Sequence, residues 1–229
     1  MKNQLAVILT LLIAAPIVIF FSRQMLPNNY LASSIYKLIF LFPIFYRVYV
    51  EKKVFRKSVS ENFSTANCRK NFPLTISVGG ILTLIYLSSF FLFRDYLDLD
   101  GIASKLQSAV SLNINNLIFI GLYIVLINSL LEEFFWRGFI FVKLEQVMKS
   151  WQAHAISGLA FSLHHIMFYY SWFDSTIFLL VTLGLVGYAI IMNFVFKKCR
   201  DLFSCWLVHV MVDVVQIFIA FQCFLLYGT

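Results

Sequence analysis

Charged residues are scarce in this chain of 229 amino acids: Asp, Glu, Lys and Arg make up 13% of it, whereas a soluble domain has about 25%. Hydrophobic residues make up 61%, and 26 Phe and 11 Tyr are among them. A water-soluble fold of this size lacks the polar surface to cover so many apolar side chains. The composition therefore excludes an ordinary soluble domain and predicts that lipid surrounds much of the chain.

Cysteine is also rare, and its spacing excludes two common uses. The four cysteines fit neither a zinc-ligand pattern nor a small disulfide framework, so we expect free thiols at Cys68, Cys199, Cys205 and Cys223. The metalloprotease motif His-Glu-x-x-His does not occur. Linkers, internal repeats and low-complexity segments are missing too, and we therefore expect residues 1–229 to form a single domain.

Long apolar runs dominate the chain instead. A helix needs about 20 mostly apolar residues to cross the hydrocarbon core. The runs predict an all-α fold, a polytopic bundle of about seven (six to eight) transmembrane helices, near residues 4–22, 30–50, 72–93, 114–136, 153–171, 175–196 and 203–227. Pro16 lies within the first run rather than after it, which favours an uncleaved anchor over a signal peptide. Lys37 interrupts the second run.

Basic residues gather in alternate loops of this bundle. Most of the 18 Lys and Arg residues lie before the first span or after spans two, four and six, and the other loops hold only Arg23, Arg94 and Lys105. The positive-inside rule then places the N-terminus in the cytoplasm and the C-terminus outside. The plasma or bacterial inner membrane is the default location, and the endoplasmic reticulum is expected for a eukaryotic source. Because topology explains the net charge of +7, we expect lipid and not nucleic acid as a partner.

Three groups of polar residues lie inside the predicted spans, where an ionisable side chain costs several kcal/mol. The first contains Glu132, Glu133 and Arg137, in the run 130–138. Glu133 and Arg137 are four residues apart and therefore share a helix face, whereas Glu132 points about 100° away from Glu133. The other two groups are the runs 161–165, which ends in His165, and 209–213, in which His209 and Asp213 are four residues apart.

The predicted topology places all three groups in the inner half of the membrane. Spans four, five and seven can then bring Glu132, His165, His209 and Asp213 around one cavity that faces the cytoplasm. His164 lies about 100° around the helix from His165, and we do not expect it in the site. Two further polar residues have plainer interpretations: His154 at an interface, and Asn128 in a bond between helices.

The three motifs, read in order, resemble a known family. Glu-Glu-x-x-x-Arg, Phe-x-x-x-His and His-x-x-x-Asn/Asp are the signature of the CAAX-protease and bacteriocin-processing (CPBP, Abi) family of intramembrane proteases. The resemblance covers about residues 114–227 and implies an α-helical membrane bundle that hydrolyses peptide bonds. It implies that the substrate is a membrane-associated peptide or a lipidated protein, which the sequence does not identify further. The oligomeric state stays open.

The resemblance also implies a role for each matching residue. Glu132 would be the base that activates water, and His165 would help to hold that water. His209 and Asp213 would stabilise the oxyanion or orient the carbonyl, and Glu133 and Arg137 would form a structural pair. An ionised Asp cannot donate a hydrogen bond. Asp213 is therefore protonated, orients His209 or ligates a metal.

A metal-dependent and a metal-free mechanism both fit these residues. No cofactor is certain from the sequence. If a metal takes part, we expect Zn²⁺, held by Glu132, His165, His209 and Asp213 with an open position for water.

Two other functions compete with an endopeptidase. Intramembrane Glu, His and Asp also mark ion pathways, so a proton-coupled transporter is one alternative. The polar groups lie at one depth, however, and do not line a full path across the membrane. The other alternative is a non-catalytic bacteriocin-immunity or membrane-assembly protein with the same fold.

Overall fold

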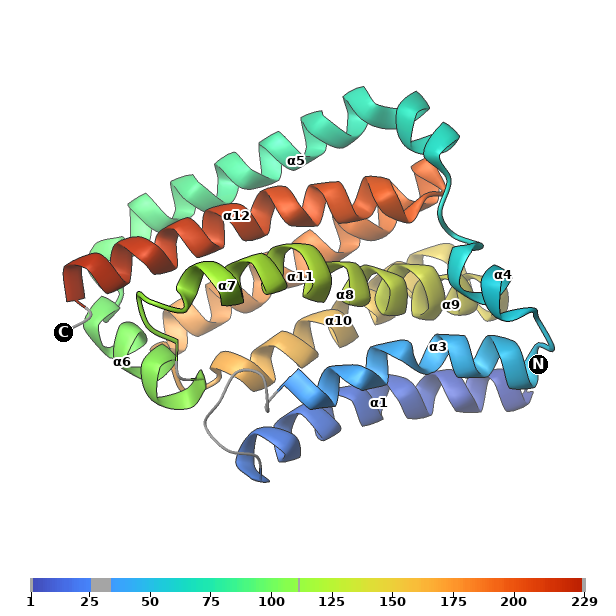
Figure 1. The fold of residues 1–229 in the computed structure, drawn as a ribbon, viewed down its shortest axis with the longest axis horizontal. Helices are drawn as coiled ribbons and strands as arrows, with labels where there is room; N and C mark the ends of the chain where they lie inside the picture. Colours follow the sequence, from blue (N-terminus) through green and yellow to red (C-terminus); the bar gives the residue numbers. More distant parts are fainter. Residues whose placement is uncertain (1, 26–33, 111, 228–229) are drawn as a thin grey trace.

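The computed structural model describes residues 2–25, 34–110 and 112–227, and these are helical with short connections (Figure 1). No strand occurs among them, so the predicted all-α class is confirmed. The first half of the chain forms α1 (Lys2–Met25), η1 (Ser34–Leu41), α3 (Phe42–Phe45), η2 (Tyr46–Val50), α4 (Phe55–Ser60), α5 (Thr65–Phe93), η3 (Arg94–Tyr96) and α6 (Leu99–Val110).

The second half begins with a continuous helical stretch over residues 117–147, which we call the central helix. It comprises α7 (Leu117–Leu122), η4 (Tyr123–Asn128), α8 (Ser129–Phe135), η5 (Trp136–Phe141) and α9 (Val142–Val147). Its parts η4 and η5 are π-helical, so the wider turns stand on both sides of Glu132 and Glu133. The chain ends with α10 (Ser150–Tyr169), α11 (Ser175–Cys199) and α12 (Leu202–Tyr227).

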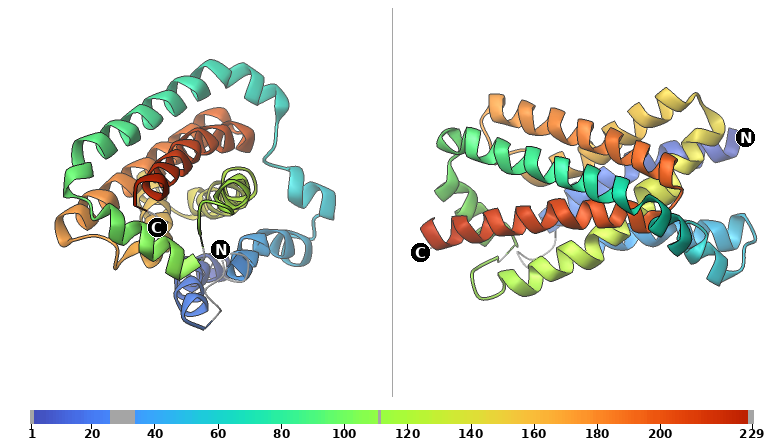
Figure 2. Two further views of the ribbon diagram at one scale, coloured as in Figure 1. Left: turned by 60° about the vertical axis from the view of Figure 1, so that its left-hand side comes forward. Right: turned by 90° about the horizontal axis from the view of Figure 1, so that it is seen from above.

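The long segments run back and forth along one axis, which leaves the two termini at opposite ends of the bundle (Figure 1). Figure 2 shows the central helix between α12 and the segment 34–50, and both of these contact it. The central helix carries a run of fully buried side chains from Phe135 to Phe141. It therefore forms the core around which the other helices pack.

Helices occupy the described part of every predicted span, but not all of them qualify as membrane-crossing by length and composition. Four stretches do so among the described residues: Phe55–Tyr96, Leu117–Val147, Ser175–Cys199 and Leu202–Leu226. They support an integral membrane protein, and the count of seven spans stays a prediction. Residues 26–33, at the start of the second predicted span, lie outside the described residues. All four cysteines are free, as expected.

The central helix continues beyond residue 136, where its predicted span ended. This extension contains two charged residues, Lys143 and Glu145, and each pairs with residues of opposite charge in neighbouring segments. Lys143 pairs with Glu51, and Glu145 lies 3.3 Å from Lys197 and 3.5 Å from Arg200. Glu132 is consequently about 22 Å of helix from the end at Val147, at a rise of about 1.5 Å per residue. It therefore lies near the middle of the central helix.

Two glycines allow helices to approach closely. A Cβ atom at Gly79 in α5 would lie 2.5 Å from Met211 Sδ in α12. One at Gly158 in α10 would lie 3.0 Å from Ile190 Cγ1 in α11. Small residues at such contacts let helix backbones pack tightly where no hydrophobic effect drives association.

The bundle end that holds the N-terminus carries a group of ion pairs, which we call the charged-end network. Its members are Arg47, Glu51, Lys53, Glu61 and Lys143. Arg47 Nε lies 2.8 Å from Glu61 Oε1, and Lys53 Nζ lies 2.6 Å from Glu61 Oε2 and 2.9 Å from Glu51 Oε2. The network ties the connection between η2 and α5 to the central helix.

Backbone carbonyls complete this junction. Arg47 Nη2 and Asn62 Nδ2 each donate to the carbonyl oxygen of Gly138 at 2.6 Å, and Arg47 Nη1 donates to that of Ser58 at 2.7 Å. Gly138 lies in the π-helical turn η5, and wide turns of this kind often mark functional sites.

Candidate active site

Glu132 lies on α8 with its carboxylate buried, and its surroundings are unusual for a buried acid. One side-chain amide approaches it: Asn128 Nδ2 donates to Glu132 Oε1 at 2.7 Å. Glu132 Oε2 has no hydrogen-bond donor within the described part of the chain. Asn128 therefore holds the carboxylate within its own helix, which corrects our expectation that it bonds to another helix.

Glu133 joins two of the three motifs. Its Oε1 lies 2.9 Å from Arg137 Nη1, so the structure contains the predicted pair. The same oxygen accepts a hydrogen bond from His209 Nδ1 at 2.8 Å, and all three side chains are buried. The guanidinium of Arg137 also stacks 4.3 Å from the ring centroid of Phe161. Glu133 thus fixes the orientation of His209 as well as that of its own helix.

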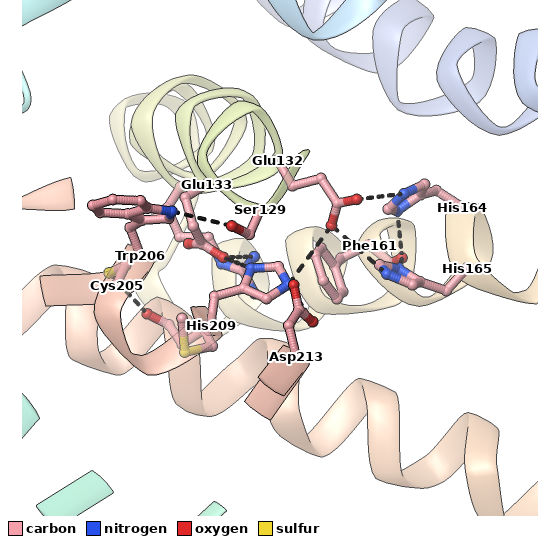
Figure 3. Close-up of polar contacts among 12 residues, drawn as sticks. Ser129, Glu132, Glu133, Phe161, His164, His165, Cys205, Trp206, His209 and Asp213 are labelled. Carbon is pink, nitrogen blue, oxygen red and sulfur yellow. Dashed lines mark hydrogen bonds and ion pairs between the residues drawn. The ribbon is translucent and has the colours of Figure 1, made fainter. Parts of the chain in front are cut away.

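His209 lies between two carboxylates (Figure 3). Its Nε2 is 3.6 Å from Asp213 Oδ1 and 3.9 Å from Glu132 Oε2. Because Nδ1 donates to Glu133, Nε2 is the atom that faces the centre of the group. A protonated ring there would supply a hydrogen-bond donor that the neighbouring carboxylates cannot supply themselves.

Both histidines of the second motif approach Glu132. His164 Nε2 lies 3.7 Å from Glu132 Oε1, and His165 Nε2 lies 3.7 Å from Glu132 Oε2. Figure 3 shows the two rings on the same side of the carboxylate. The structure therefore brings together all four predicted catalytic residues and adds His164, which we had excluded.

The sequence contains a signal for His164 that we missed because we considered only its angle from His165 around the helix. Phe161, His164 and His165 occupy positions i, i+3 and i+4, which lie on one helix face. His164 also stacks on Trp136 of the central helix, with 5.6 Å between the ring centroids and 28° between the planes. His154 is 4% exposed and its ring lies 4.7 Å from that of Phe141, and its position at the membrane interface stays a prediction.

Lys37 is a further charged residue near this group, and it comes from the N-terminal part of the chain. It lies in η1 with 7% of its surface exposed and interacts electrostatically with Glu132 and Asp213. Its Nζ is 5.4 Å from the ring centroid of Tyr123. An ionisable residue within an apolar run is by default a candidate functional residue, a signal that we interpreted only as an interruption of the span.

The site is largely closed. Glu132, His209 and Asp213 are at most 6% exposed, whereas the side chain of His165 is 26% exposed. A cleft of about 650 Å³ lies between the end of α5 and the end of α12, where Phe90, Arg94 and Phe218 are among its lining residues, and Glu132 does not line it. Entry of a substrate to Glu132 would therefore begin on the side of His165.

The side chains offer a set of metal ligands that differs from the predicted one. Within the described residues, one ligand atom each of Glu132, His164 and His165 lies within 4.8 Å of the other two. These donors, two imidazoles and a carboxylate, are suited to Zn²⁺ with an open position. His209 and Asp213 are not part of this group.

Comparison with known proteins gives one match. Residues 114–215 match the family model described as Type II CAAX prenyl endopeptidase Rce1-like. This segment is just under half of the chain and contains all three motifs. No curated protein and no solved structure matched. The resemblance that the motifs predicted is thus confirmed by a family-model match over residues 114–215.

Proposed function

We propose that this protein is a membrane-embedded endopeptidase that hydrolyses a peptide bond in a membrane-associated peptide or a lipidated protein. The observation that carries the proposal is the position of Glu132. Its carboxylate is buried within the segment that the family model matches, and it lies within 4 Å of three imidazoles. Imidazoles exchange protons near neutral pH, so a carboxylate among them is well placed for proton transfer during a reaction.

Hydrolysis would proceed through a water molecule beside Glu132. The carboxylate removes a proton as the water oxygen attacks the peptide carbonyl carbon, and a tetrahedral intermediate with a negatively charged oxygen forms. Protonated His209 stabilises that oxygen from Nε2, since Glu133 fixes its Nδ1. The intermediate then collapses, the carbon–nitrogen bond breaks, and Glu132 passes its proton to the leaving amine.

Asp213 fits best as the residue that orients His209. It lies 3.6 Å from His209 Nε2, and as a carboxylate it stabilises the protonated ring. His165, the most exposed of the group, would hold the water on the open side. A Zn²⁺ ion bound by Glu132 and the two neighbouring histidines would lower the pKa of a bound water.

The charged end of the bundle would face the cytoplasm. This end carries the N-terminus and Arg47, Lys53, Lys143 and Lys197, in agreement with the positive-inside rule (Figure 1). The C-terminus would then lie outside.

Peptide cleavage by the purified protein in lipid nanodiscs tests this function. A mixed peptide library with mass-spectrometric readout would compare the wild type with Glu132→Gln, His165→Ala and His209→Ala. Two controls come from the same helices: Glu145→Gln at the charged end of the central helix, and His154→Ala in α10. We expect cleavage to be lost in the three site variants and retained in both controls. Unchanged cleavage by Glu132→Gln would overturn the assignment.

A further inference from the structure

The segment 34–50 runs beside the central helix in the same direction, toward the charged end of the bundle (Figure 1). The contacts between the two elements advance in step along the chain. The ring centroid of Phe40 lies 5.1 Å from that of Phe135, and the ring centroid of Tyr46 lies 5.2 Å from that of Phe139. These two contacts fix how the residues of the segment align with those of the central helix.

Lys37 lies one turn of the 3₁₀ helix η1 before Phe40, and on the same face, because residues three apart eclipse each other in such a helix. Both side chains are buried accordingly, whereas Leu38 between them is 63% exposed. One turn spans about 6 Å, which equals about four residues of an α-helix. Counting back this far from Phe135 places Lys37 within about one residue of the level of Glu132.

Two further observations place the ammonium group of Lys37 at the site. The Phe40 ring lies edge-on to the ring of His164, with 5.5 Å between their centroids, so this face of η1 borders the site. Lys37 also interacts electrostatically with Glu132 and Asp213. Its ammonium group therefore lies among the groups that the proposed hydrolysis uses, although η1 lies outside the segment that the family model matches.

The charges of the site can be counted pair by pair. Two of its three carboxylates have a cation beside them: the pairs are Glu133 with Arg137, and Asp213 with protonated His209. Lys37 is then the cation that matches Glu132. When Glu132 takes a proton from the attacking water, its negative charge moves to the oxygen of the tetrahedral intermediate. A fixed positive charge in a largely closed site stabilises that oxygen without any reorganisation of solvent.

We propose that Lys37 takes part in the hydrolysis as a charge-balancing residue: its ammonium group stabilises the negative charge first on Glu132 and then on the tetrahedral intermediate. This inference rests on the proposed function and adds a residue from the N-terminal part of the chain. It also accounts for Asp213 in a motif that accepts Asn or Asp. An Asn amide can donate a hydrogen bond to the intermediate and an ionised Asp cannot, so the charge of Lys37 compensates for that loss.

Steady-state kinetics in lipid nanodiscs test this role, with the full-length protein and a peptide that the wild type cleaves. The variants are Lys37→Met, which removes the charge but keeps an unbranched side chain, and Lys37→Arg, which keeps the charge. Lys143→Met is the matched control, because Lys143 is also buried but lies in the charged-end network. Rates would be expressed per folded molecule, and Lys37→Gln replaces Lys37→Met if the latter does not fold.

We expect kcat to fall about 100-fold in Lys37→Met with little change in KM, because a group that stabilises the intermediate is lost. Lys37→Arg should retain more of the rate, and Lys143→Met should match the wild type. The inference is overturned if Lys37→Met keeps the wild-type kcat, if only KM rises, or if Lys37→Arg loses as much as Lys37→Met.

The same samples separate this inference from the proposed function. Cleavage that Glu132→Gln abolishes and Lys37→Met leaves unchanged contradicts only the role of Lys37. An absence of cleavage by every form, or cleavage that Glu132→Gln leaves unchanged, contradicts the proposed function and this inference with it.

Discussion

The charged-end network and the group around Glu132 both gather carboxylates, but different groups contact these carboxylates. Both carboxylate oxygens of Glu51 and of Glu61 contact an ammonium or guanidinium group. Three of these contacts are 2.6–2.9 Å long, and the fourth is the pair of Glu51 with Lys143. Glu132 receives one amide hydrogen and faces three imidazoles, and Lys37 interacts with it electrostatically. The first set of contacts consists of permanent cations, whereas imidazoles can gain or lose a proton near neutral pH. We therefore expect the first arrangement to contribute to stability and, under the proposed function, the second to contribute to reactivity.

The largest expected effect that separates the two is the loss of the carboxylate at the site. Glu132→Gln removes the base but keeps the shape and the amide contact with Asn128, so we expect peptide hydrolysis to fall about 100- to 10,000-fold. The midpoint of thermal unfolding should stay the same or rise, because a buried charge has been removed. Turnover and thermal unfolding would be measured on the same nanodisc samples. A large drop in the midpoint would mean that Glu132 is structural.

The converse change is expected from Arg47→Met in the network. Arg47 is 2% exposed and supplies donors to Glu61, Ser58 and Gly138. Its loss leaves a carboxylate and two carbonyls without this partner, and we expect a cost of about 3–5 kcal/mol in the free energy of unfolding. Denaturant unfolding in mild detergent would measure it, with the exposed Arg56→Met as control. Turnover per folded molecule should not change, and its selective loss would mean that the network reaches the site.

The pH dependence of stability should distinguish the network from the rest of the chain. Burial raises the pKa of Glu51, but hydrogen bonds and charge from Lys143 and Lys53 outweigh this, and the net pKa is lower than its ordinary value. A carboxyl whose folded pKa is lowered stabilises the fold above its unfolded pKa of about 4.3, and this contribution is lost as the pH falls further.

We therefore expect the unfolding midpoint of the wild type to decrease below about pH 4.3, and to decrease less steeply in Glu51→Gln. Thermal unfolding followed by circular dichroism between acidic and neutral pH would measure both slopes. If the unfolding midpoints of the two proteins decreased in parallel, Glu51 would contribute nothing to the loss of stability at acidic pH.

The smallest effect is expected at the exposed edge of the network. The side chain of Lys53 is 31% exposed, and solvent screens its pairs with Glu51 and Glu61. Lys53→Met should cost about 0.2–1 kcal/mol, and high salt should reduce the difference from the wild type. A cost as large as that of Arg47→Met would mean that the network acts as one unit rather than as a buried centre with a solvated edge.

Sequence reasoning reached the helical class and the convergence of the three motifs, because apolar runs and the order of motifs are local properties of the chain. It missed features that depend on a partner distant in sequence. The central helix extends past residue 136 because Glu51, 92 positions from Lys143, neutralises that lysine. We interpreted Lys37 only as an interruption of an apolar span, because the sequence does not show that it lies near Asp213 in the fold.

His164 shows a different limit. The angle between neighbouring helix positions suggested that only one of two adjacent histidines can face a given point. Two long side chains anchored on the same Phe161 carbonyl nevertheless reach the two oxygens of one carboxylate. Backbone periodicity predicts the face of a helix, and side-chain reach widens that face.

A π turn takes in one residue more than an α turn, so the length of η5 sets the angular phase between Glu132 and Lys143. Deletion of one residue between 138 and 141 would leave the Glu-Glu-x-x-x-Arg motif intact. It would also rotate everything after it by about 100° and turn Lys143 away from Glu51. Relatives of this chain should therefore accept substitutions in this turn far more readily than changes in its length.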